Sequence, residues 1–267
     1  MLNYQVISAN LPSELNIVLM HGLFGESGNL MNIAKVLQES LNATVVVPDM
    51  LSHGLSVKRE HMTYSLMAEY VEGLISHLNL NFVVLVGHSM GGKIAMQMIE
   101  RARHAYLAVV IADIAPVDYP LIHTPIFDAM LHIDNALSAG EIQQRKQADA
   151  MLMNAVPEVP LRQFLLKNLK RNNEKQWAWQ FGLSQLAGSY PELAQAPLHH
   201  GNASDIPCLV IKGGLSDYIQ VSAEAAFNAR FNDISFKIIQ GVGHWLHAEK
   251  PQLFTRIITQ FIQSKIA

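Results

Sequence analysis

A serine in a five-residue turn, directly behind a strand-like run, is the feature that most restricts how this chain can fold. The run is Phe82-Val83-Val84-Leu85-Val86, and the turn is Gly87-His88-Ser89-Met90-Gly91. The glycines two residues either side of Ser89 carry no Cβ atoms at a point where a strand has to pass straight into a helix. The pattern therefore predicts a strand, a strained turn that lifts the Ser89 hydroxyl clear of the sheet, and a helix that opens at Met90.

Short apolar runs alternate with stretches of helical periodicity in the first and last parts of the chain. The strand candidates are 16–20, 44–47, 82–86, 107–112, 208–211 and 235–239, and the helix candidates are 30–41, 67–78, 93–103, 223–231 and 251–263. Strands that alternate with helices indicate a parallel sheet with right-handed crossovers. The predicted fold class is therefore α/β, with a mainly parallel sheet flanked by helices.

The alternation stops between residues 116 and 206. Helical patterns occupy 141–153 and 159–169 without intervening strands, prolines interrupt the stretch, and Trp177 and Trp179 lie in an aromatic patch. We interpret 116–206 as a helical cap inserted after the strand that ends at Asp113. Residues 1–115 and 207–267 then form the core domain.

Length and composition exclude several classes of protein. The 267 residues suffice for one large α/β domain, and the formal net charge of −3 gives no indication of a nucleic-acid partner or an anionic membrane surface. The single cysteine, Cys208, excludes an internal disulfide framework and fits a reducing compartment.

The chain start lacks a basic stretch followed by an apolar one, and the apolar runs are too short to span a bilayer. We therefore expect a cytoplasmic protein that acts on a small molecule, with no membrane partner. The oligomeric state is left open.

Ser89 requires a base, because a serine hydroxyl is a weak nucleophile at neutral pH, and the base requires an orienting group. The best candidate is His244, in a glycine-bearing loop just past the last predicted strand. That position lies at the carboxyl edge of a parallel sheet, the edge where Ser89 is also expected. His247 is the competing base, whereas His88 and His53 are interpreted as structural.

Two aspartates compete for the role of orienting acid. Asp113 ends the strand candidate 107–112, and Asp217 follows the strand candidate 208–211. Both are expected at the carboxyl edge, and either could reach the far side of His244. Because most loop aspartates simply cap turns or helices, the residues alone leave this choice open.

An oxyanion hole should complete the machinery, because charge that develops on a carbonyl oxygen must be met by fixed donors. One donor is expected from the backbone N–H of Met90, directly after the nucleophile. The other is expected from the loop Met20-His21-Gly22-Leu23-Phe24-Gly25, with Leu23 preferred and Phe24 as its rival.

No metal or cofactor is predicted. The chain has no H-E-x-x-H motif, no paired cysteines and no G-x-x-x-x-G-K-S/T phosphate loop. Lys93, which follows two glycines, lacks the spacing of a phosphate-binding lysine and is interpreted as an ordinary helix residue.

The motifs taken together resemble the α/β-hydrolase superfamily over nearly the whole chain, and most closely the small bacterial esterases of the YbfF type with their eukaryotic abhydrolase relatives. The matching strings are HGLFG at 21–25, HGLS at 53–56, GHSMGGK at 87–93, DIAPVDY at 113–119 and GHWLHAEKP at 243–251. The resemblance implies a serine hydrolase that cleaves carboxylic esters or thioesters, acyl-CoA among them, through an acyl-enzyme intermediate.

The resemblance also bears on the acid. In the similar esterases the aspartate after the earlier strand serves as the acid, and a serine holds the later position. By that resemblance Asp113 orients His244 and Ser216 adds a hydrogen bond, with Asp217 as the alternative acid.

An apolar substrate pocket is expected from Trp177, Trp179 and Trp245.

Two other functions would use the same catalytic residues or the same fold. A carbon–carbon bond hydrolase would apply the same triad to a diketone-like substrate, and a non-catalytic protein would only bind a ligand. Haloalkane dehalogenases and epoxide hydrolases are disfavoured, because they carry aspartate where this chain has Ser89.

Overall fold

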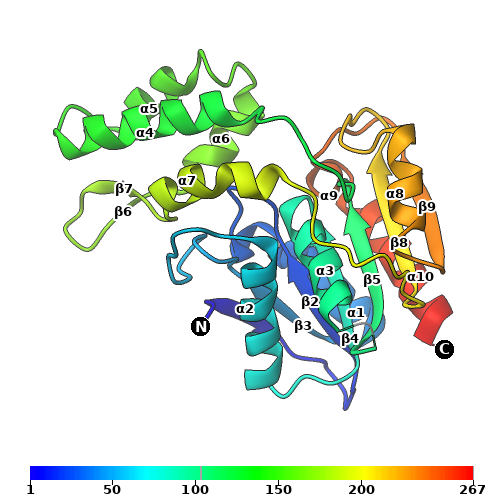
Figure 1. The fold of residues 1–267 in the computed structure, drawn as a ribbon. Helices are drawn as coiled ribbons and strands as arrows, with labels where there is room; N and C mark the ends of the chain where they lie inside the picture. Colours follow the sequence, from blue (N-terminus) through cyan, green and yellow to red (C-terminus); the bar gives the residue numbers. More distant parts are fainter. Residues whose placement is uncertain (103, 267) are drawn as a thin grey trace.

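A seven-stranded sheet forms the centre of the computed structural model, which describes residues 1–102 and 104–266 (Figure 1). The strands lie in the order β1-β3-β2-β4-β5-β8-β9, and only β1 is antiparallel to its neighbour. Their bounds are β1 (Tyr4–Ile7), β2 (Asn16–Met20), β3 (Thr44–Pro48), β4 (Val83–His88), β5 (Tyr106–Ala112), β8 (Cys208–Gly213) and β9 (Ile234–Ile239). The predicted mainly parallel sheet is confirmed.

Helices cover both faces of this sheet, and the central strands are apolar for that reason. Alternate residues of β4 enter different apolar clusters: Val83 and Leu85 join one, and Val84 and Val86 the other. The first face carries α2 (Tyr64–His77), α3 (Met90–Arg101) and α8 (Glu224–Asn228); the second carries α1 (Met31–Leu41) and α10 (Pro251–Ile266). Short helices η1 (Ser27–Asn29), η2 (Val221–Ala223) and α9 (Leu246–Glu249) lie in the loops.

The six expected strands lie within two residues of their predicted bounds, and β1 is an addition. This four-residue edge strand has two exposed central residues, so it lacks the apolar signal of its neighbours. The helix expected to open at Met90 and to continue over 93–103 does begin at Met90, and residue 103 lies outside the described residues. None of the helices in the described part of the chain combines the length and hydropathy needed to cross a bilayer.

The chain leaves the sheet after β5 and returns to it at β8, and the segment 116–206 between them is called the cap below. Figure 1 shows α7 between α4 and the core, with the β6–β7 hairpin at the far end of the cap. The elements are α4 (Thr124–Ser138), α5 (Arg145–Leu152), α6 (Val159–Leu166), β6 (Leu169–Arg171), β7 (Trp177–Trp179) and α7 (Leu183–Ala194). The expectation of a cap without strands was wrong, because strands of three residues are too short to show a period.

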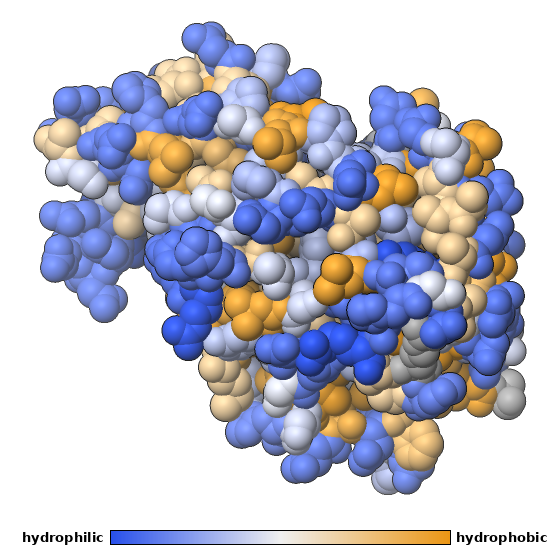
Figure 2. All heavy atoms as spheres, viewed as in Figure 1, coloured by the Kyte–Doolittle hydropathy of each residue, from blue (hydrophilic) through white to orange (hydrophobic). Residues whose placement is uncertain are grey.

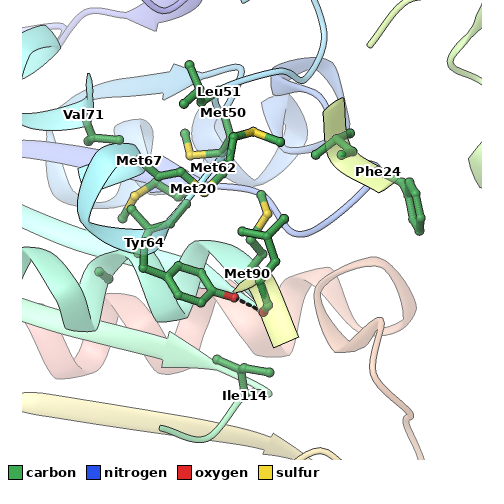
Figure 3. Packing of buried hydrophobic residues seen from close by; sticks show 14 of the residues in the cluster. Met20, Phe24, Met50, Leu51, Met62, Tyr64, Met67, Val71, Met90 and Ile114 are labelled. Atoms are coloured by element: carbon green, nitrogen blue, oxygen red, sulfur yellow. Dashed lines mark hydrogen bonds between the residues drawn. The ribbon is translucent and has the colours of Figure 1, made fainter. Parts of the chain in front are cut away.

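The cap and the core share one apolar interior. A single buried cluster runs from β4 and β5 through α2 and α3 into α4 and α7. Figure 3 shows methionines of this cluster gathered near Tyr64: Met20, Met50, Met62, Met67 and Met90. Methionine fills irregular gaps well, which suits a junction between two differently shaped layers. The outer face seen in Figure 2 is mostly hydrophilic, with apolar residues in small groups.

Candidate active site

Ser89 lies in the turn between β4 and α3, as the sequence predicts. Its backbone is in the left-handed region, with φ at +53° and ψ at −120°. Its N–H donates to the carbonyl of Ala112 at 2.9 Å, which ties the turn to the end of β5. Such a conformation is strained for a residue with a side chain and persists because the surrounding structure holds it. The half-buried serine thus stands at the start of α3.

Two glycines allow α3 to approach the sheet at this turn. A Cβ atom on Gly87 would lie 2.2 Å from the carbonyl oxygen of Gly91. One on Gly91 would lie 2.5 Å from the carbonyl oxygen of Met20, at the end of β2. Both neighbours are backbone atoms that cannot move aside. Any larger residue would therefore push the helix away from the strands.

His244 connects Ser89 to a buried carboxylate. It comes from the loop after β9, and its Nε2 lies 3.0 Å from the Ser89 hydroxyl oxygen. Its Nδ1 lies 2.7 Å from Oδ2 of Asp113. With Nδ1–H donating to the carboxylate, Nε2 carries the free lone pair and can accept the serine proton. The three side chains form one continuous hydrogen-bonded chain.

Asp113, and not Asp217, lies against His244. Asp113 is fully buried directly after β5, and its Oδ1 accepts the N–H of Gly213 at 2.8 Å. The hydroxyl of Ser216 donates to its other oxygen. Asp217 is exposed, and the hydrogen bond described for it uses its main-chain carbonyl, which accepts from Gln220. The structure thus brings Asp113 and Ser216 together at the histidine.

Three other histidines near Ser89 hold main-chain groups. His88 donates from Nε2 to the carbonyl of His244 at 2.9 Å, and Nε2 of His53 accepts the N–H of Phe24 at 3.2 Å. Nε2 of His21 accepts the N–H of Met50 at 2.9 Å. Burial lowers the pKa of His53 to about 3 and lowers the pKa values of His21 and His88 as well.

The competing base, His247, does not face the serine. Its ring packs 4.2 Å from that of His88 and 6.2 Å from that of Phe254, between centroids. Burial lowers its pKa to about 4, so the imidazole is neutral near pH 7.

Two backbone N–H groups border the space above Ser89. No hydrogen bond among the described residues uses the N–H of Leu23 or of Met90, and both residues line a cavity at the serine. The N–H of the rival, Phe24, is already engaged with His53. The free pair is therefore Leu23 and Met90, the arrangement needed to receive an oxyanion.

Two cavities meet at Ser89, and Leu23, His123 and Tyr218 border both. The wider cavity measures about 210 Å³ and contains His244; its other walls are Gly22, Phe24, His88, Ile126, Leu161 and Trp245. The narrower one measures about 50 Å³, and its other walls are Tyr64, Met90, Lys93, Ile114, Tyr119, Pro120, Ile122, Tyr190, Leu193 and Ala194.

Of the three tryptophans expected at the pocket, only Trp245 borders these cavities. Trp177 donates its indole N–H to Gln143 at 3.0 Å and lies under the guanidinium of Arg171, at the outer hairpin. Trp179 is buried and stacks on Phe181 at 5.8 Å between ring centroids. The hairpin geometry corrects the expectation: it carries both residues away from Ser89.

A family model described as "Alpha/beta hydrolase family" matches residues 17–257. The chain belongs to the α/β-hydrolase family.

Named esterases and lipases are among the proteins similar to this α/β-hydrolase. Esterase YbfF of Escherichia coli is 35% identical over 249 residues, which cover 92% of each chain. The sn-1-specific diacylglycerol lipase ABHD11 of Mus musculus is 33% identical over 98% of this chain and 85% of that protein. A solved structure described as a marine microorganism esterase superposes with a TM-score of 0.90 at 31% identity, covering 97% of this chain and 98% of that one.

Two residues at the site of this α/β-hydrolase carry no signal in the sequence. The ring of Tyr218 stacks on the His244 imidazole, with centroids 3.9 Å apart and planes at 19°. Its hydroxyl lies 3.0 Å from Nε2 of His123 in the cap. Tyr218 directly follows Asp217, in a loop whose expected site residues are Ser216 and Asp217. His123 belongs to no motif. In the described part of the chain, no three His, Cys, Asp or Glu side chains are grouped to hold a metal ion.

The surroundings of two glycines, one in the turn and one in α2, predict opposite effects of alanine on the free energy of unfolding. Gly91→Ala places a methyl group against the carbonyl of Met20 and should lower the free energy of unfolding by more than about 2 kcal/mol. Gly73→Ala, inside α2 with no atom within 4 Å, should raise it by about 0.5–1 kcal/mol. Urea unfolding of both variants measures the difference. Equal stabilities would refute the close approach described for Gly91.

The buried histidines predict that stability falls on acidification. Five histidines have a pKa below the ordinary 6.5: His21, His53, His88, His123 and His247. As pH falls from about 6.5 toward 4, these histidines bind protons in the unfolded chain but not in the folded chain. Between its unfolded and its folded pKa, each such histidine lowers the free energy of unfolding by up to about 1.4 kcal/mol per pH unit.

Urea unfolding at pH 7.5, 6, 5.5 and 5 should show this decline. His247→Leu should make the slope shallower, whereas His77→Gln should leave it unchanged because His77 is exposed. A stability that does not change between pH 7 and pH 5 would contradict the assignment of neutral buried imidazoles.

Proposed function

We propose that this α/β-hydrolase is a serine esterase in which Ser89 is the nucleophile, His244 the general base and Asp113 the orienting acid. The observation that carries the proposal is the hydrogen-bonded chain from the Ser89 hydroxyl through both nitrogens of His244 to the buried Asp113. The names of the similar proteins, esterases and a lipase, support the same reaction class.

The reaction proceeds by acyl transfer in two steps. Oγ of Ser89 attacks the ester carbonyl as its proton passes to Nε2 of His244, and the N–H groups of Leu23 and Met90 bind the oxyanion. The tetrahedral intermediate breaks its bond to the leaving oxygen, which takes the proton from His244. Water then gives a proton to His244 and attacks the acyl-enzyme, and the return of that proton to Ser89 releases the acid.

Asp113 keeps His244 in the productive tautomer and stabilises the imidazolium that forms in each step. Its carboxylate is itself fixed by the N–H of Gly213 and the hydroxyl of Ser216. Tyr218 covers one face of the imidazole and limits how far the ring can tilt.

The two cavities divide the substrate between them. His244 must protonate the leaving group, so the leaving group occupies the wider cavity, which contains His244 and Trp245. The acyl chain then occupies the narrower cavity, whose walls include Tyr64 and Tyr119. We therefore propose an ester of an apolar, bulky leaving group with a compact acyl chain. Thioester cleavage and a cytoplasmic location stay predictions.

Ser89→Ala should abolish ester hydrolysis without unfolding the protein. The expected loss is on the order of 10⁶ in kcat, as for other dissected serine triads. The assay is p-nitrophenyl butyrate hydrolysis together with labelling by a fluorophosphonate probe and peptide mapping. A folded wild-type protein whose Ser89 does not react with the probe would count decisively against a serine hydrolase.

The two aspartates should differ sharply when each is replaced. Asp113→Asn removes the charge that orients His244 and should lower kcat on the order of 10⁴-fold. Asp217→Asn is the matched control and should retain most activity, since its side chain is exposed. Steady-state kinetics on one ester compares the two variants, and a crippled Asp217→Asn beside an active Asp113→Asn would reverse the assignment.

A further inference from the structure

Lys93 is buried beside the nucleophile, although the sequence indicated an ordinary helix residue. It lies in the first turn of α3, four residues after Ser89, and is 1% exposed. Its Nζ donates to three main-chain carbonyls: Val117 at 3.0 Å, Ala194 at 3.1 Å and Gln195 at 2.5 Å. The expectation is therefore corrected: this buried amine is held by three backbone acceptors.

These three carbonyls belong to the two linkers of the cap. Val117 lies in the outgoing linker, between β5 and α4, and Ala194 and Gln195 lie where α7 ends and the chain returns toward β8. The linkers also touch each other, because the N–H of Tyr119 donates to Ala194 at 2.9 Å. A single side chain from the helix of the nucleophile thus holds both ends of the cap.

The chemistry of the amine matches this arrangement. A protonated lysine has three N–H donors, one for each carbonyl, and the rings of Tyr119 and Tyr64 lie 4.6 and 5.5 Å from Nζ. Burial lowers the pKa of Lys93 to about 7, while the carboxylate of Asp118 opposes that shift and Arg230 adds to it. Enclosing such a group costs free energy that a methionine of similar shape would not cost. The position is therefore poorly explained by core packing alone.

Two other polar residues on the same face of α3 contact the returning linker. Gln97, one turn after Lys93, accepts the N–H of Leu198 at 2.8 Å. Glu100, almost one turn further, accepts the N–H of His200 at 3.0 Å. Spacings of four and three residues place all three side chains on one face of the helix. Among the described hydrogen bonds of this face, those of Lys93 reach both linkers.

Lys93 also forms part of the wall of the narrower cavity. That wall includes Tyr64, Tyr119 and Leu193. The hydroxyl of Tyr64 donates to the carbonyl of Leu193 at 2.5 Å, and Figure 3 shows this ring beside Met90. Displacement of the linkers would therefore change the shape of the cavity next to Ser89.

We propose that Lys93 is a positioning residue that fastens both linkers of the cap to the helix of the nucleophile and thereby sets which acyl chains fit beside Ser89. This inference rests on the proposed esterase function for its link to acyl selectivity. The fastening itself does not depend on that function.

The test compares Lys93→Met, which keeps the shape and removes the donors, with Lys93→Arg, which keeps the charge and donors. Lys35→Met is the matched control, because Lys35 is exposed on α1 and, among the described residues, its ion pair is a 4.0 Å contact with Glu39. Three measurements apply to each protein: hydrogen exchange of 115–119 and 194–198, kcat and KM for p-nitrophenyl acetate and hexanoate, and fluorophosphonate labelling of Ser89.

For Lys93→Met we expect exchange at both linkers to rise at least about tenfold, with α4 unchanged. The ratio of the KM for the hexanoate to the KM for the acetate should change at least about tenfold, and labelling should show that Ser89 still reacts. Lys93→Arg should restore part of the selectivity, and Lys35→Met should match wild type. If Lys93→Met does not fold, Lys93→Gln, with two donors on a shorter side chain, should show the same changes at smaller size.

Unchanged exchange at both linkers would overturn the proposal, as would an equal loss on both esters with faster exchange throughout the protein. If the wild-type protein hydrolyses neither ester and Ser89 is not labelled, the proposed function fails. The exchange measurement then still decides whether Lys93 fastens the linkers.

Discussion

The distance between α3 and the ends of β2 and β4 controls the geometry of everything around Ser89. Glycine at positions 87 and 91 lets backbone meet backbone, so that the helix starts directly over the sheet edge. That contact fixes the serine in its left-handed conformation and places Met90, whose N–H has no partner among the described hydrogen bonds, at the cavity. The same short distance brings Lys93, one turn along, under the cap linkers. The close approach of α3 to the strand ends thus positions both the nucleophile and Lys93.

Much of the core was predictable because each element carries its own signal. The buried strands are continuous apolar runs, and Ser89 and His244 follow from the rule that strand ends share an edge. The choice between Asp113 and Asp217 was not predictable from residues alone, since both follow strands at that edge. It depends on which side chain the loop turns inward. Asp113 has φ at +53° at a fully buried position, whereas Asp217 is turned to the solvent by a loop whose preceding serine faces inward.

The cap was harder to predict because its side chains are placed by contacts distant in sequence. Trp177 and Trp179 looked like pocket residues from composition, yet a short hairpin directs them elsewhere. Tyr218 and His123 meet at the site across 95 residues of sequence, and no local period indicates such a pair. The role of Lys93 is not predictable for the same reason, since its partners lie in linkers that only the folded chain brings to the helix.

The cap is inserted between β5 and β8, which are neighbours in the sheet. β8 runs parallel to β5, so the returning chain passes along α3 before it enters β8. The two linkers nevertheless meet where the N–H of Tyr119 donates to Ala194, so the helical part of the cap leaves and rejoins the core at nearly the same place. Its length and internal structure can consequently change without altering the register of any strand or the position of Ser89, His244 and Asp113. The substrate range can therefore change through replacement of the cap, while the catalytic machinery stays in place at the sheet edge.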